Sequence, residues 1–440
     1  MLNSLFIILI LILSNLSAAE FISEDVNGTK KQPSWIALPY VFSSQSTGLT
    51  GGVVGIFNGY IQPQTTIVIT AFGGESVDVK KYDETKGVLA PAQKANTQGL
   101  FLGISGYRVP FSKRLFLSAM GSYAYYPNQR LYVDGSNDSK RDLSLDTPSL
   151  TPIQTHGYNN WGSVDVRYVL PWGESKEKVL PVVKLKNGLP VNRQKSGGGV
   201  PFITGQTLVG VEYFYKHMRI DQIENKPALS SNGLRLYMQH DNTDYSNNPS
   251  KGYKFELKGS FDFGLGDSTQ SWNALEGSYS HFIQTENFSW SRNNVLALNF
   301  WSAYSPSWEN KDDTKILKRH RPPMWEGAHL GGWTRLRAYD SSRFSDKAAI
   351  YGAAEYRVIP KLNPLRGKKW NPFPIDWFQT VLFVEAGRVN SRYNVAELLS
   401  DMKYDVGFSL RALAAKVPVR FEMAFGQEGS SMWVMVKQPF

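Results

Sequence analysis

The chain of 440 residues contains no cysteine. This absence excludes disulfide bonds, thiolate metal sites, thiol nucleophiles and the lipidated cysteine that anchors a bacterial lipoprotein. A chain of this length without disulfides must be stabilised by packing or by a closed ladder of backbone hydrogen bonds.

Long apolar runs are also missing after residue 20. A transmembrane helix needs about 18 or more consecutive apolar residues, and the mean hydropathy of this chain is negative. The sequence therefore excludes a helical membrane protein. It leaves a membrane β-barrel open, because a barrel strand needs an apolar residue only at every second position.

Histidine is scarce, with six residues and no close pair, so we expect neither a metal nor another cofactor. The formal net charge of +10 would suit nucleic acid as a partner. However, lysine and arginine are dispersed rather than gathered into a stripe, so we expect no nucleic-acid partner and interpret them as lumen and loop charge.

Residues 1–19 resemble a secretory signal peptide, with an apolar run at 5–13 and small residues at 17–19. Positive charge is missing before the run, and a single uncleaved anchor helix is the alternative. A run of about nine apolar residues is too short to span about 30 Å of hydrocarbon. We therefore expect cleavage near Ala19 and a mature chain that starts near Glu20.

The rest of the chain alternates between apolar and polar residues with a period of two. One example has an apolar face made of Tyr253, Phe255, Leu257, Phe261 and Phe263. The residues between them form a polar face: Lys254, Glu256, Lys258, Ser260 and Asp262. Such strands place one face against lipid and the other in a polar lumen.

Sixteen segments of this kind can be placed along the chain. They lie near 35–42, 52–61, 64–74, 98–109, 114–126, 158–171, 206–219, 231–241, 252–264, 271–285, 290–305, 348–359, 377–388, 403–413, 417–426 and 431–440. An even number of long strands is typical of an outer-membrane barrel, and a soluble multi-sheet β protein is the alternative. The sequence predicts an all-β fold, a transmembrane 16-stranded antiparallel β-barrel.

The connections between these segments alternate mostly between long and short, as they do in a barrel whose termini are periplasmic. Long external loops fall near 75–97, 127–157, 220–230, 306–347 and 389–402. One long segment, 172–205, lies on the side of the short turns, and the sequence offers no physical account of it. We divide the chain into a signal peptide at 1–19, a short N-terminal segment at 20–34 and a barrel domain at 35–440.

Three short motifs stand in or beside these segments. Leu336-Arg337-Ala338-Tyr339 lies in the longest loop, and Phe383-Val384-Glu385-Ala386-Gly387 lies in a strand. The third motif is a turn that carries Asp241, Asp244, Pro249 and Gly252.

In this order the motifs resemble those of the BamA/TamA superfamily, also called the bacterial surface antigen family. The family forms are hydrophobic-Arg-Gly-aromatic, D-x-R-D-N-x-x-x-P-x-x-G and F-x-D-x-G. This chain departs from them by Ala338 for glycine, Thr243 for arginine, Tyr245 for asparagine and Glu385 for aspartate.

The resemblance implies that the longest loop folds into the barrel and that its arginine meets acidic residues of the wall. Strand parity places Glu355 and Glu385 in the lumen. We therefore expect Arg337 to pair with Glu385, Glu355 or both, with Tyr339 and Gly387 belonging to the same loop tether. The alternative for Arg337 is an ordinary solvated loop arginine.

The resemblance also implies a function. It predicts a barrel that assists translocation or insertion of a polypeptide or lipid at the outer membrane without a chemical step, and a barrel-only member lacking polypeptide-transport-associated domains. The expected partners are outer-membrane lipid, the barrel-assembly machinery during insertion of this chain, and a polypeptide or lipid client of unknown identity. As the insertion signal we expect a terminal strand that runs to Phe440, which would share a face with Met432, Val434 and Val436.

Two other classes of function remain open from the sequence. A passive channel or structural surface antigen needs only the barrel. A lipid hydrolase would use His240, Asp244 and Ser246, but a nucleophile needs its base within hydrogen-bond reach, and all three residues fall around one turn. We expect no enzyme activity.

Overall fold

The computed structural model describes residues 22–25, 33–44, 48–79, 82–83, 88–89, 94–132, 153–192, 202–218, 229–308, 320–365, 375–414 and 417–440. Sixteen strands form one sheet. They are β2 Ser34–Ser44, β3 Gly48–Asn58, β4 Thr66–Asp78, β7 Lys94–Arg108, β8 Leu115–Leu131, β9 Ile153–Val169, β12 Gln206–Met218, β13 Leu229–Asp241, β14 Gly252–Asp262, β15 Trp272–Thr285, β16 Ser291–Tyr304, β19 Ala348–Pro360, β20 Ile375–Asn390, β21 Lys403–Ala414, β22 Val417–Gly426 and β23 Gly429–Val436.

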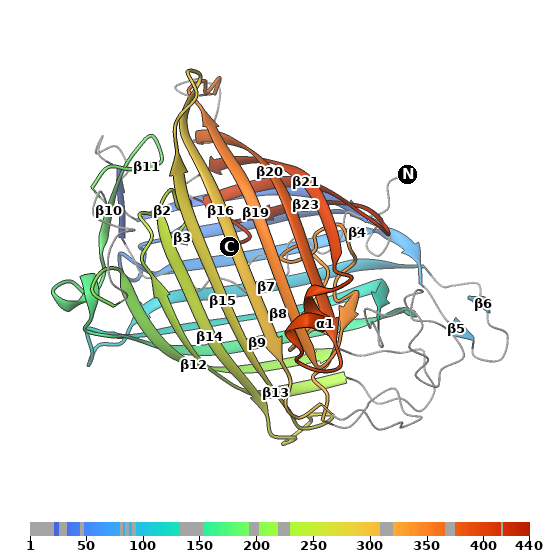
Figure 1. Cartoon of the computed structure of the whole chain (residues 1–440). Helices are drawn as coiled ribbons and strands as arrows, with labels where there is room; N and C mark the ends of the chain where they lie inside the picture. Colours follow the sequence, from blue (N-terminus) through green and yellow to red (C-terminus); the bar gives the residue numbers. More distant parts are fainter. Residues whose placement is uncertain are drawn as a thin grey trace.

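Each strand of this sheet pairs antiparallel with its neighbours in the chain, and β2 and β23 are the two ends of the order. The sheet curls into a barrel of steeply tilted strands (Figure 1). A simple up-and-down order follows from the sequence, because short turns join antiparallel neighbours directly. The predicted 16-stranded antiparallel barrel is confirmed.

The strands alternate between a lumen face and an outer face, as the period of two predicts. In β20, Val381, Phe383 and Glu385 are buried, whereas Leu382 and Val384 are 67% and 48% exposed. Apolar side chains on the outer face and charged ones inside are what a barrel wall in lipid requires. Neither of the two described helices, α1 Val395–Leu399 and η1 Gly173–Lys176, has the length and apolar character needed to span a membrane.

The two ends of the barrel differ. At the loop end lie α1, β5 Tyr82–Asp83 and β6 Val88–Leu89, and at the opposite turn end lie β10 Val182–Lys186 and β11 Leu189–Pro190 (Figure 1). The loop between β16 and β19 carries two short strands, β17 His329–Leu330 and β18 Phe344–Ser345, which pair with each other. This loop is the element that positions the candidate site.

The segment 172–205, which the sequence left without an account, forms part of a three-stranded sheet at the turn end. β10 and β11 make a hairpin through Asn187 and Gly188, which both have positive φ, at 52° and 74°. The third strand is β1 Ile22–Asp25, from the short N-terminal segment, and it pairs with β10 in parallel. An Asn-Gly pair is the strongest short signal for such a hairpin.

The chain terminus corrects one prediction. β23 ends at Val436 and does not run to Phe440. Lys437 has a φ of 65°, which turns the chain away from the strand direction, and Pro439 has no N–H for a ladder. The Phe440 ring stacks on Phe282 inside the barrel at 6.4 Å between ring centroids, so it does not lie on the outer face.

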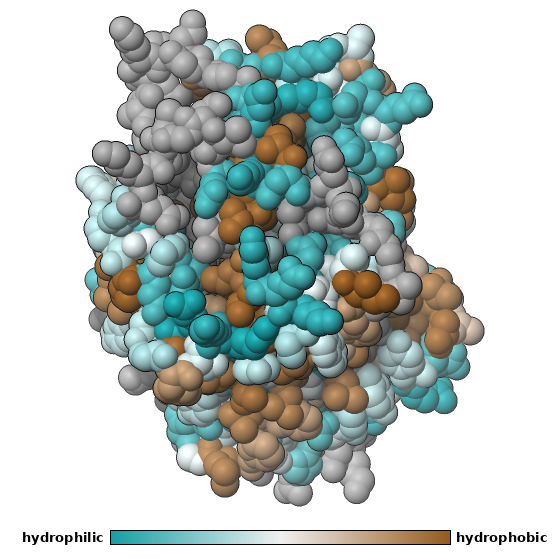
Figure 2. Space-filling view, turned by 90° about the vertical axis from the view of Figure 1, so that its left-hand side faces the viewer, coloured by the Kyte–Doolittle hydropathy of each residue, from teal (hydrophilic) through white to brown (hydrophobic). Residues whose placement is uncertain are grey.

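Figure 2 views the molecule from the side on which Figure 1 places β10 and β11. Hydrophilic side chains gather across the middle of this face, and hydrophobic side chains gather below them. The turn end therefore presents a polar surface beside an apolar wall.

Candidate functional site

The tip of the loop between β16 and β19 is folded back on itself by backbone hydrogen bonds. Gly332 donates its N–H to the Tyr339 carbonyl at 3.0 Å, and Tyr339 donates to the Leu336 carbonyl at 3.0 Å. Gly332 has a φ of 109°, which favours glycine, and Leu336 adopts the left-handed region at 53°. This tight fold presents Arg337 at the end of the loop.

The Arg337 side chain is fully buried and contacts three carboxylates. Its Nε lies 3.0 Å from Glu385, its Nη1 lies 2.9 Å from Glu422, and its Nη2 lies 2.9 Å from Glu355. Its guanidinium carbon also lies 3.6 Å from the centre of the Phe383 ring. A planar guanidinium with five donors suits this arrangement, whereas lysine offers a single point charge.

The barrel wall also binds the backbone at the loop tip. The Arg337 N–H donates to Glu385 Oε2 at 2.7 Å, and the Ala338 N–H donates to Asp405 Oδ2 at 2.8 Å. In the other direction, the Trp433 indole N–H donates to the Arg337 carbonyl at 2.7 Å, and the Ser431 hydroxyl donates to the Ala338 carbonyl at 3.0 Å. The loop tip is thus held through its main chain as well as its charge.

The Arg337 contacts belong to a larger buried ion network. Arg411 Nη2 lies 2.9 Å from both Glu355 and Glu422, Arg357 pairs with Glu355 at 2.8 Å, and Arg420 pairs with Glu422. Burying charges is costly unless each is paired, and removing one partner of such a pair costs about 3–5 kcal/mol. The network therefore favours one position of the loop strongly.

Small residues make room for the loop. A Cβ atom on Gly387 would lie 2.9 Å from Leu330 of the loop and 3.1 Å from the Ile350 carbonyl oxygen. Gly426 makes room for Ala338 in the same way, because a Cβ atom at Gly426 would lie 2.9 Å from the Cβ atom of Ala338. Ala338 stands where the resembled family has glycine.

The Tyr339 side chain is also held by the wall. Burial raises the pKa of Tyr339 to about 12, and its hydroxyl donates to the Tyr404 carbonyl at 3.1 Å.

The turn motif forms a separate unit between β13 and β14 at the turn end. Asp244 Oδ1 accepts the N–H groups of Tyr245, Ser250 and Lys251 at 3.0, 2.8 and 3.3 Å. Gly252 has a φ of 100°, where the chain enters β14. These bonds give the aspartate a structural part in closing the turn.

Asp241 and Pro249 also belong to this turn. Asp241 Oδ1 accepts from the Thr243 N–H at 2.9 Å and from the Thr243 hydroxyl at 2.6 Å. Pro249 is buried, and the adjacent Asn248 Oδ1 accepts from Gln438 Nε2 at 2.9 Å. The turn thus contacts the chain terminus inside the barrel.

The residues of the hydrolase alternative have other partners. His240 Nδ1 lies 2.9 Å from the Thr207 hydroxyl, and the Ser246 hydroxyl donates to Asp241. Asp244 accepts the three backbone bonds of the turn. The described contacts therefore engage these side chains in the turn and strands and not in a nucleophile-base-acid relay.

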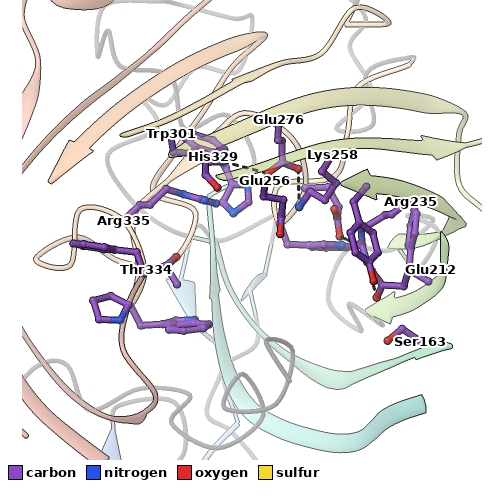
Figure 3. Close-up of a pocket in the computed structure, with 18 of the residues that line it drawn as sticks. Ser163, Glu212, Arg235, Glu256, Lys258, Glu276, Trp301, His329, Thr334 and Arg335 are labelled. Atoms are coloured by element: carbon purple, nitrogen blue, oxygen red, sulfur yellow. Dashed lines mark hydrogen bonds and ion pairs between the residues drawn. The ribbon is translucent and has the colours of Figure 1, made fainter. Parts of the chain in front are cut away.

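A cavity of about 730 Å³ lies in the lumen between the loop and the wall. Figure 3 shows charged residues of both signs around it, from the strands and from the loop. Arg235 lies 3.2 Å from Glu212 and 2.6 Å from Glu326 of the loop, and Lys258 lies 3.0 Å from Glu276.

Two further loop residues border this cavity. The guanidinium of Arg335 stacks on the Trp301 ring at 3.8 Å. Burial, and then the nearby Arg335 cation, lowers the pKa of His329 to about 4. The loop side of the cavity therefore offers a neutral imidazole at neutral pH and a cation, Arg335, that is stacked on a ring of wall strand β16.

The structure brings together the predicted residues Arg337, Glu355 and Glu385. Tyr339 lies in the same loop as Arg337, and Gly387 lies against that loop. The turn residues lie elsewhere, whereas the Phe440 ring borders the ion network, 5.0 Å from the Arg357 guanidinium. Sequence reasoning missed Glu422, Asp405 and Trp433 as partners of the loop tip. Strand parity placed Asp405 on a polar face, but it could not indicate which lumen charges the loop reaches.

Sixteen antiparallel strands with an apolar outer face, and a loop anchored in the lumen by a buried arginine, define an outer-membrane β-barrel with an internal plug. Residues 210–430, half of the chain, match the family model described as the Omp85 superfamily domain. The chain belongs to the Omp85 superfamily, whose barrels translocate or insert proteins at the outer membrane.

Several solved structures are similar to this chain. BamA from Haemophilus ducreyi lacking POTRA domains 1–3 has 12% identity and a TM-score of 0.45 over 93% of this chain and 69% of its own. CdiB from Acinetobacter baumannii has 12% identity and a TM-score of 0.48 over 90% and 57%. CdiB from Escherichia coli has 9% identity and a TM-score of 0.53 over 90% and 59%. At these identities the similarity concerns the fold, and no curated protein matches the chain significantly.

Proposed function

We propose that this chain assists a polypeptide in crossing or entering the outer membrane, without a chemical step. In this proposal the loop between β16 and β19 is an internal gate, and the Arg337 network holds the gate closed. The turn end faces the periplasm and the loop end faces the exterior.

The observation that carries the proposal is the burial of Arg337 among Glu355, Glu385 and Glu422. A loop folded into the lumen narrows the path that a passive pore needs. A loop fixed by ion pairs and by four backbone hydrogen bonds instead has one well-defined closed position, from which displacement is a discrete event.

The lumen cavity supports a polypeptide as the client. Its paired charges and aromatic rings offer hydrogen bonds, charge and stacking to segments of varied sequence (Figure 3). The ion pair between Arg235 and Glu326 joins the wall to the loop across this cavity. A client in the cavity would therefore compete directly with a contact that holds the gate.

The test is the outer-membrane and secreted proteome of a host that lacks the gene, measured by quantitative mass spectrometry. We expect a defined set of polypeptides to be depleted, wild-type chain to restore them, and Arg337→Ala to restore them poorly while the barrel inserts in normal amount. Arg392→Ala is the matched control, because Arg392 is an exposed loop arginine with a side chain 78% exposed.

An unchanged proteome, together with steady conductance that survives removal of the loop, would instead establish a passive channel. A change confined to outer-membrane lipid would reassign the client from polypeptide to lipid.

A further inference from the structure

Residues 173–192 form a cap at the turn end, attached to the barrel wall on two sides. On one side, Gln206 Nε2 donates to the Val179 carbonyl at 3.0 Å. On the other side, the Trp377 indole N–H donates to the Gly188 carbonyl at 3.1 Å, and Arg292 donates to the Asn187 carbonyl at 3.2 Å. The cap that carries the β10–β11 hairpin is therefore held by β12 on one side and by β20 and the start of β16 on the other.

The two faces of β10 differ in character. Val183 and Leu185 are buried and pack against Tyr245 of the β13–β14 turn. Lys184 and Lys186 alternate with them and are exposed. The turn motif thus supports β10 from the inside, which leaves its lysine face exposed and its edge opposite β11 available to another strand.

β1 occupies that edge. It pairs with β10 in parallel through four residue pairs, with Glu24 opposite Lys184 and Asp25 opposite Leu185. A strand edge binds an extended peptide mainly through main-chain hydrogen bonds, so it accepts many sequences. A ladder of four residue pairs is short, so a competing extended segment has few main-chain hydrogen bonds to replace.

The charge of the cap indicates which segments fit this edge. Four exposed lysines lie on the cap, against one exposed glutamate at 177: Lys176, Lys178, Lys184 and Lys186. The sequence of β1 has two adjacent acidic residues, Glu24 and Asp25, and the first of them lies opposite Lys184. The edge therefore favours an extended segment that is acidic.

We propose that β10 is a docking strand for an extended, acidic segment of the client polypeptide, and that β1 occupies this strand in the resting protein. The proposal rests on the proposed function for the identity of the client. The client then contacts the cap first, and β1 competes with the client for β10.

The absence of cysteine makes a direct test possible, because an introduced cysteine is unique. The purified full-length Lys184→Cys variant is mixed with a peptide of residues 21–26 in which Glu24 is replaced by cysteine. The peptide cysteine carries a 5-thio-2-nitrobenzoate disulfide, so that the protein thiolate attacks its sulfur and thionitrobenzoate leaves. We expect this exchange to form the mixed disulfide about tenfold faster than with Lys178→Cys, since strand pairing holds the two sulfurs in register. Lys178 is an exposed cap lysine outside β10, so equal rates at the two positions would overturn the proposal.

A second variant, Glu24→Cys with Lys184→Cys, tests the competition. Oxidation of this pair ties β1 to β10 covalently, and reduction leaves β1 held by strand pairing alone. We expect a fluorescent peptide of residues 21–26 to bind the reduced protein and to lose most of its binding to the oxidised protein. The same peptide with lysine in place of Glu24 and Asp25 should bind the reduced protein weakly.

Equal binding of the acidic peptide to the oxidised and reduced forms would also overturn the proposal. Peptide docking is measured on purified protein, whereas the proposed function is measured on the cell proteome. Docking at position 184 with an unchanged proteome would refute the transport role alone. A depleted proteome without docking would refute the docking strand alone.

Discussion

Glu385 binds Arg337 twice, once through the backbone and once through the side chain. Its Oε2 accepts the Arg337 N–H at 2.7 Å, and its Oε1 accepts the Arg337 Nε–H at 3.0 Å. Tyr351 donates its hydroxyl to the same carboxylate. One wall residue therefore fixes both the position of the loop tip and the direction of its guanidinium.

Arg337→Ala is expected to release the loop from the lumen. The substitution removes the only cation that the described contacts pair with Glu385, and loss of one partner of a buried ion pair costs about 3–5 kcal/mol. Limited digestion of the purified barrel with trypsin measures the release, because Arg343 of the loop is buried in the folded protein. We expect cleavage at Arg343 to become fast.

Arg392→Ala should leave that cleavage slow. Adding Glu385→Gln to Arg337→Ala should recover part of the protection, since the buried carboxylate without a cation is then replaced by a neutral amide. Fast cleavage at Arg343 in the wild-type protein would contradict a loop fixed by Arg337.

Gly387→Ala is expected to displace the loop by crowding and without a change of charge. The new Cβ would lie 2.9 Å from Leu330, and overpacking of this kind costs about 1–3 kcal/mol. The thermal unfolding midpoint of the purified barrel should fall, and Leu330→Ala in the same chain should recover part of the loss. Gly73→Ala is the matched control in a strand, because nothing lies within 4 Å of its Cβ position.

Asp244 gives a prediction that separates a hydrogen-bond role from a charge role. Burial raises the pKa of Asp244 above its ordinary 3.8, although three N–H groups donate to it. All three bonds end on Oδ1, so the side-chain amide oxygen of the Asp244→Asn variant can accept them, whereas Asp244→Ala leaves three donors without their acceptor. We expect Asp244→Ala to cost about 1–3 kcal/mol and Asp244→Asn much less.

The pH dependence of this turn has a definite sign. A carboxyl whose pKa is higher in the folded than in the unfolded protein favours the folded state when protonated, and that contribution is lost as the pH rises through the folded pKa. Thermal midpoints of wild-type and Asp244→Asn barrels, compared above pH 4, should therefore move apart in favour of the variant as the pH rises. A wild-type advantage that grows with pH would show that the charged form is the stabilising one.

Phe440→Ala is expected to loosen the chain terminus inside the lumen. The ring stacks on Phe282 and lies 5.0 Å from the Arg357 guanidinium, contacts worth about 1–3 kcal/mol together. Hydrogen exchange should accelerate in the last residues and, through the bond from Gln438 to Asn248, in the β13–β14 turn. Val434 lies on the face of β23 opposite to Trp433, so Val434→Ala should leave hydrogen exchange in that turn unchanged.

Whether Phe440 also serves as an insertion signal stays a prediction. The amount of each variant in the membrane checks it.

Much of this architecture follows from local rules. The alternation in β14 and β20 predicts the strands and which side chains enter the lumen, Glu355 and Glu385 among them. That Arg337 meets these carboxylates was implied by the family resemblance. The same parity places many other charges inside. Glu422 could not be selected among them, because the choice depends on where the packed loop ends.

The remaining errors have a common physical cause, which is contact between distant segments. Lys437 adopts a positive φ that a non-glycine residue disfavours, and the contacts of Phe440 inside the barrel accompany it. The pairing of β1 with β10 joins residues far apart in the chain, and β1 has too few residues to show a period of its own. Local sequence carries little information on either feature.

Trp433 and Ser431 lie on β23, the last strand of the sheet order, and both donate to carbonyl oxygens of the loop tip. The loop inside the lumen is therefore bonded directly to the last strand of the sheet order. Force applied to the loop from inside the lumen is delivered to β19–β22 through the carboxylates, and also to β23, which pairs with β22 in the described part of the sheet. A displacement of the loop at the centre of the barrel therefore breaks two hydrogen bonds at the last strand of the sheet order.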